Sequence, residues 1–174
     1  IGTDNVAIGE ASLDAVTTGS DNTAVGDNAG GALTTGDENI AIGSGALLVA
    51  TTASDNTAIG SSALKANTTA DNNVAIGKDA LLYNTTGAQN VAVGSVALAA
   101  NTTASENVAV GYAALTAATT GGNNIAIGKD ALIALTTGNT NIAIGTDALT
   151  TNVAGDRNVA VGEQSLKNMN PSGN

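Results

Sequence analysis

The stretch Asn73–Gly77, Asn-Val-Ala-Ile-Gly, decides the fold, because its pattern returns every 17 residues along the chain. In each copy the first residue is Asn, the third Ala, the fourth Ile or Val and the fifth Gly. The copies begin at Asn5, Asn22, Asn39, Asn56, Asn73, Asn90, Asn107, Asn124, Asn141 and Asn158. An unbroken period of this kind predicts a repeat array, not a globular core. We expect residues 1–174 to form a single repetitive domain, cut from a longer chain.

The composition excludes several classes of function. The chain carries five Lys and Arg against fifteen Asp and Glu, a formal charge of −10, and it has no Cys, His, Trp or Phe. Nucleic acids and anionic membrane surfaces both require clustered basic residues, so we expect neither as a partner. Thiol and imidazole chemistry are absent, and no apolar run approaches the roughly 20 residues of a membrane-spanning helix. The composition therefore predicts a soluble, acidic protein built from small residues.

The local pattern predicts an all-β fold. Each repeat holds two short apolar segments closed by Gly or polar residues, which indicates strands and turns. Glycines and Thr pairs in every repeat would destabilise a helix. The β-branched residues at positions two and four share one face of a strand, and Ala and Gly occupy the other. The Gly at position five is expected to adopt a positive φ or to allow a tight backbone contact. Together these features predict a repetitive β-helix or β-solenoid.

The residues present in every copy are expected to build the structure by core packing and by ladders of hydrogen bonds. Stacked Asn side chains can bond along such a ladder, as they do in other stacked β-structures. The Ile at position four is assigned to the core, together with the Leu at position nine. In two representative copies the structural residues are Asn73, Ala75, Ile76, Gly77, Leu81, Asn124, Ala126, Ile127, Gly128 and Leu132. No catalytic, cofactor-binding or metal-binding residue is assigned, and no cofactor is expected.

A single repeat is too small to fold alone. It buries one or two large apolar side chains, worth roughly 1.5–3 kcal/mol each. Ordering its backbone costs about 1–2 kcal/mol per residue, so stacking of repeats is obligatory. The core stays thin even after stacking, because the chain has no Phe or Trp. This deficit indicates that other copies of the chain supply further burial, and we expect a homotrimer.

The wider pattern, N-x-A-[I/V]-G-x-x-A-L-x-x-x-T-T-G, resembles the repeats of phage and prophage-like long tail fibres. The segments Asn73–Gly87 and Asn124–Gly138 carry it most fully. The shorter core of the pattern also looks like the head repeats of trimeric autotransporter adhesins, which usually lack the Thr-Thr-Gly segment. The first resemblance implies an elongated extracellular shaft, trimeric and joined to other fibre segments, with a host receptor bound by another part of the parent protein. The second implies an adhesin that binds a host ligand through its lateral face.

Two geometries satisfy the repeat. A chain that coils on itself rises about 4.8 Å per repeat, so ten repeats span about 48 Å. Three intertwined chains would stretch the same repeats to roughly 140 Å. Carboxylates occupy the last position of four consecutive repeats, and in a self-coiled chain they would form one repulsive column. They are Asp4, Asp21, Glu38 and Asp55. That column favours intertwining.

Three further hypotheses concern binding. The acidic column supplies oxygen ligands of the kind Ca²⁺ prefers, but it does not recur in every copy, which favours a solvated face. The Thr-Thr pairs suggest an ice-binding or carbohydrate-binding face, although adjacent strand residues point to opposite sides. Each of Asn67, Asn84 and Asn101 begins an Asn-Thr-Thr sequon. The function these residues favour is a structural shaft segment that positions a receptor-binding tip.

Overall fold

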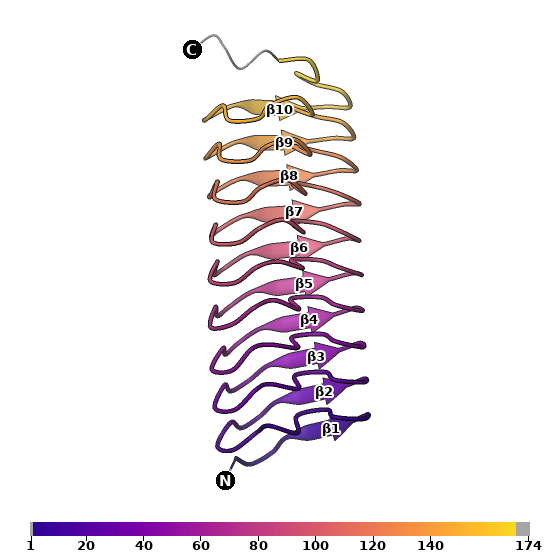
Figure 1. Cartoon of the computed structure of the whole chain (residues 1–174). Helices are drawn as coiled ribbons and strands as arrows, with labels where there is room; N and C mark the ends of the chain where they lie inside the picture. Colours follow the sequence, from indigo (N-terminus) through magenta and orange to yellow (C-terminus); the bar gives the residue numbers. More distant parts are fainter. Residues whose placement is uncertain (1, 170–174) are drawn as a thin grey trace.

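The computed structural model describes residues 2–169, so residues 1 and 170–174 of the predicted domain lie outside the described part. Within these residues the chain forms a straight β-solenoid in which each repeat contributes one short strand, and one coil of the chain leads from each strand to the next (Figure 1). The strands are β1 (Val6–Ile8), β2 (Thr23–Val25), β3 (Ile40–Ile42), β4 (Thr57–Ile59), β5 (Val74–Ile76), β6 (Val91–Val93), β7 (Val108–Val110), β8 (Ile125–Ile127), β9 (Ile142–Ile144) and β10 (Val159–Val161). The predicted all-β repeat fold is confirmed.

The strands pair in parallel and in sequence order, forming one ten-stranded sheet along the axis. Equivalent residues of neighbouring repeats lie side by side, so that Ala58 pairs with Ala75 and Ala75 with Ala92. Each repeat therefore climbs one strand spacing, and the chain coils on itself. The expected intertwining is wrong. The acidic column does not prevent self-coiling because Asp4, Asp21, Glu38 and Asp55 are all exposed, where water screens their repulsion.

Only one of the two predicted apolar segments is a strand. The segment around position nine forms turns, because residues at positions seven and nine adopt left-handed backbone conformations. In the fifth repeat these are Asp79, with φ 58°, and Leu81, with φ 50°. A left-handed residue reverses the direction of an extended chain, so this segment cannot continue as a strand. It folds back across the coil and forms the wall opposite the sheet.

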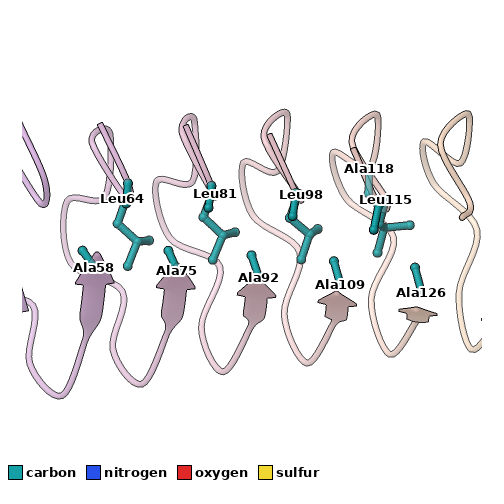
Figure 2. Packing of buried hydrophobic residues seen from close by; sticks show 14 of the residues in the cluster. Ala58, Leu64, Ala75, Leu81, Ala92, Leu98, Ala109, Leu115, Ala118 and Ala126 are labelled. Carbon is teal, nitrogen blue, oxygen red and sulfur yellow. The ribbon is translucent and has the colours of Figure 1, made fainter. Parts of the chain in front are cut away.

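The interior of the coil is filled by Ala from the strands and Leu from the opposite wall (Figure 2). In the fifth repeat Ala75 and Leu81 are both fully buried. The placement of Ile76 and Ile127 in the core is wrong, because these side chains lie on the outside of the coil, 37% and 39% exposed. Side chains alternate along a strand, and the Leu of the opposite wall leaves room only for the small residue.

Backbone hydrogen bonds run along the axis in the turns as well as in the sheet. The Val74 N–H donates to the Asn90 carbonyl at 2.8 Å, and the Tyr83 N–H donates to the Ala99 carbonyl at 3.0 Å. Because so many bonds join one coil to the next, each coil depends on its neighbours for stability. The part of the chain that the structure describes includes no helix long and apolar enough to cross a membrane.

Candidate functional site

The Asn at position one forms a buried ladder that follows the axis. The Asn124 side chain is fully buried, and its Nδ2 donates to Asn107 Oδ1 at 3.2 Å and to the Gly138 carbonyl at 2.9 Å. Its Oδ1 accepts hydrogen bonds from the backbone N–H and the Nδ2 of Asn141. Asn73 occupies the same place between Asn56 and Asn90. These amides join three coils each and are structural.

The Gly at position five lies where neighbouring coils approach most closely. Gly77 has φ 132° and Gly128 has φ 130°, a conformation that residues with a Cβ rarely adopt. A Cβ on Gly77 would lie 2.6 Å from the carbonyl carbon of Gly94 in the next coil. Both expected reasons for Gly, the positive φ and the tight contact, therefore apply. Ala126 and Leu132 are fully buried in the eighth repeat, as Ala75 and Leu81 are in the fifth.

The outward residues of the strands form a continuous apolar surface, here called the strand face. It consists of positions two and four of all ten repeats, and only Thr23 and Thr57 among them are not Val or Ile. Ile42, Ile76 and Ile144 are each 37% exposed. Monomeric proteins rarely expose contiguous apolar patches larger than a few hundred Å². A stripe that runs the length of the coil is typical of an interaction surface.

A second, shorter ladder of Asn side chains runs along the axis inside the coil, at position twelve of the fourth to sixth repeats. Asn84 Nδ2 donates to Asn67 Oδ1 at 3.1 Å, and Asn101 Nδ2 donates to Asn84 Oδ1 at 2.7 Å. All three side chains are fully buried. The Asn-Thr-Thr sequons are therefore inaccessible to glycosylation in the folded chain, because their acceptor nitrogens are enclosed and hydrogen-bonded.

This ladder ends on an unpartnered atom, which leads to a prediction. Asn101 Oδ1 is buried without a hydrogen-bond partner in the described structure, and the next coil places Ala118 at the same position. We expect the side chain introduced by Ala118→Asn to donate to Asn101 Oδ1. The unpartnered oxygen then moves to position 118, because Leu135 of the next coil offers no donor, so the free energy of unfolding should rise by no more than about 1 kcal/mol. Denaturant unfolding measures this gain. An equal gain in stability from Ala118→Leu would show that the larger side chain, and not the new hydrogen bond, is the cause.

The Thr pairs form two columns with different roles. At position thirteen the hydroxyl groups bond along the axis; Thr85 Oγ1, for example, donates to the Thr102 carbonyl at 2.9 Å. At position fourteen the side chains are exposed in every repeat that has the pair: Thr18, Thr35, Thr52, Thr69, Thr86, Thr103, Thr120 and Thr137. Only one column thus presents its hydroxyl groups fully to solvent. The ice-binding or carbohydrate-binding hypothesis for this column stays a prediction.

Three pairs of oppositely charged side chains lie close together in the described part of the chain: Lys78 with Asp79, Lys129 with Asp130, and Lys167 with Asp147. Within residues 2–169, no group of three or more Asp or Glu side chains is placed to hold a metal ion. The hydrogen bond and the charge of Asp130, 2.8 Å away, raise the pKa of Lys129. The hydrogen bond from Lys167, also 2.8 Å long, lowers the pKa of Asp147. Such exposed pairs contribute little to stability because water screens them.

A shallow groove interrupts the regular surface on the wall opposite the sheet. Its volume is about 350 Å³. It is lined by Val49, Ser62, Lys65, Ala66, Asp79, Leu82 and Tyr83. Tyr83 is 59% exposed and Val49 39%, which makes them two of the most exposed apolar side chains of the inner coils. The sequence predicts no binding role for these residues, because two Tyr in the whole chain are too sparse to indicate a sugar-stacking surface. The coil places Tyr83 beside Ala66, which only the tertiary structure shows.

No protein-family model, curated protein or solved structure matches this chain. The resemblance to fibre repeats therefore rests on the sequence pattern alone. Two surfaces of the coil are suited to binding: the strand face, which runs along all ten repeats, and the groove beside Tyr83.

Proposed function

We propose that this chain is a structural shaft segment of an extracellular fibre, resembling a phage tail fibre, in which three copies pack through their strand faces. The observation that carries the proposal is the strand face itself, an uncharged stripe of Val and Ile along the whole coil. Burial of such a stripe is favourable at roughly 25 cal/mol per Å². Another copy of the chain suits it because that copy repeats its apolar residues at the same spacing.

The mechanism is mechanical. Each coil is tied to the next by the sheet, by the Asn ladder and by hydrogen bonds between the turns, so the array resists bending and stretching. Packing three such arrays side by side adds the burial that the thin Ala and Leu core lacks. A rigid shaft of this kind holds a receptor-binding tip, carried by another part of the parent protein, away from the particle surface. The number of copies follows the resemblance to trimeric fibres.

Small-angle scattering tests the assembly because it measures mass and length together. We expect three times the 16.6 kDa chain mass and a length near 50 Å, since the self-coiled chain rises about 4.8 Å per repeat. A particle of twice the chain mass would indicate a face-to-face dimer instead of a trimer. A monomer at high concentration would contradict the shaft proposal.

The substitution Ile76→Asp tests whether this side chain belongs to the outward strand face or to the core of the coil. The chain should remain folded, since Ile76 points out of the coil, whereas assembly should weaken by at least about 3 kcal/mol because an unpaired charge would be buried between copies. Circular dichroism checks the fold and sedimentation checks the mass. The matched control is Ser61→Asp, at position six, where Glu10 and Asp27 show that an acidic residue is tolerated. Loss of folding in Ile76→Asp alone would contradict the outward placement.

A further inference from the structure

The groove beside Tyr83 arises because two coils carry larger side chains at position eleven, where most repeats have Ala. Position eleven holds Val49 in the third repeat, Ala66 in the fourth and Tyr83 in the fifth. Val49 and Tyr83 are two coils apart, or about 9.6 Å on the strand spacing, and the small Ala66 between them leaves a slot about one coil high. A slot of that height accommodates one flat ring lying against the Tyr83 side chain. Its volume of about 350 Å³ falls in the range of small-molecule sites.

The lining combines an apolar body with polar groups. Val49, Ala66 and Leu82 provide apolar surface, and Tyr83 adds an aromatic ring. The remaining lining residues are Lys65, whose ammonium group donates, Asp79, whose carboxylate accepts, and Ser62, whose hydroxyl group does both. A ligand with one apolar face and a rim of hydroxyl groups satisfies both kinds of surface.

The charges of the lining argue for a neutral ligand. Lys65 and Asp79 carry opposite charges, so a charged ligand would be attracted by one and repelled by the other. Among residues 2–169 Lys65 makes no ion pair, and Asp79 lies 3.9 Å from Lys78, a distance too long for a strong one. Both groups therefore keep hydrogen-bonding capacity. The formal charge of −10 on the whole chain further disfavours an anion.

We propose that this groove binds one neutral pyranose unit of a polysaccharide, with the apolar face of the sugar stacked on Tyr83 and its hydroxyl groups toward Lys65, Asp79 and Ser62. Aromatic side chains favour such a ring because their flat faces supply a large apolar surface. The groove lies on the wall opposite the strand face, so the inference does not depend on the trimer. In a trimer it would present three sites to solvent, and it would let the shaft itself contact a surface glycan.

The two Tyr residues make binding directly observable, since the chain contains no Trp. In the variant Tyr112→Phe, Tyr83 becomes the sole fluorophore. We expect its emission to change on titration with at least one of the neutral hexasaccharides of glucose, galactose, mannose or N-acetylglucosamine. Sialyllactose, a charged comparator, should bind at least tenfold more weakly than that sugar. No response to any neutral sugar, or a response only to phenol or indole, would overturn the proposal.

Calorimetry on four variants then places the site. Tyr83→Ala and Ala66→Leu should each lower the association constant at least tenfold, the first by removing the stacking surface and the second by filling the slot. Ala66→Leu is expected to fold, because position eleven holds Val49 and Tyr83 in neighbouring coils. The matched controls Tyr112→Ala and Ala117→Leu, the latter at position eleven of another coil, should change the constant less than twofold. Sugar binding that survives Ala66→Leu in a folded variant would overturn the assignment.

Discussion

Replacement of Gly77 by Ala should be among the most damaging single changes in this chain, costing more than about 3 kcal/mol of unfolding free energy. The φ of 132° alone costs an L-residue about 1–3 kcal/mol. The added Cβ would also meet the Gly94 carbonyl carbon and oxygen at 2.6 Å. Those atoms belong to the backbone of the next coil, so relief requires the two coils to separate and their hydrogen bonds to lengthen.

The separation should be visible as a loss of cooperativity. An array of coils is stabilised by contacts between nearest neighbours, so a break in the middle divides it into two halves that unfold independently. Denaturant unfolding of Gly77→Ala should then show two transitions at lower midpoints. Hydrogen exchange should accelerate most at the Gly94 N–H, which donates to the Ile76 carbonyl at 2.8 Å in the intact chain.

Gly45 provides the matched control. Its φ is 65°, and the nearest atom to an added Cβ is Ser62 Oγ at 3.9 Å. Asn28 already occupies the equivalent place with φ 55°. We expect Gly45→Asn to leave stability unchanged or slightly raised, since Asn tolerates this conformation and has less freedom than Gly in the unfolded chain. Equal damage from Gly45→Asn and Gly77→Ala would contradict the close-contact argument.

Asn124→Ala should destabilise the chain by about 2–6 kcal/mol, because it leaves at least two buried polar groups without partners, at about 1–3 kcal/mol each. The Asn141 backbone N–H would lose its acceptor, which lies at 2.9 Å. The Gly138 carbonyl would lose its donor, also at 2.9 Å. Since Asn124 is hydrogen-bonded to Asn107 and Asn141, its removal would weaken the contacts of its coil with both neighbouring coils.

Denaturant unfolding of Asn124→Ala measures the effect, and Asn139→Ala is its control. Asn139 Oδ1 accepts from the Gly122 N–H at 2.9 Å, but this side chain is exposed. Water can replace an exposed partner, so its removal should cost no more than about 1 kcal/mol. If the two substitutions cost the same, the buried ladder would not be a major source of stability.

Several features of the fold could be read from the repeat itself. The 17-residue period requires a stacked array. Because the chain has no Phe or Trp, a single coil buries too little apolar surface to be stable without its neighbours. The invariant Gly at position five predicts an unusual φ or a close contact, and both are present at Gly77. The invariant Asn predicts a ladder, and Asn73 and Asn124 lie in one. These inferences succeed because each depends on one residue type and its spacing.

Other features depended on contacts between segments. Alternation along β5 separates Ala75 from Ile76 but does not say which points inward; that is decided by the opposite wall, where Leu81 fills the coil and leaves room only for Ala. The left-handed φ of Leu81, which forms this wall, runs against the usual preference of Leu. Self-coiling, the outward strand face and the groove between Val49 and Tyr83 all follow from that wall, because they depend on which residues the closed coil brings together.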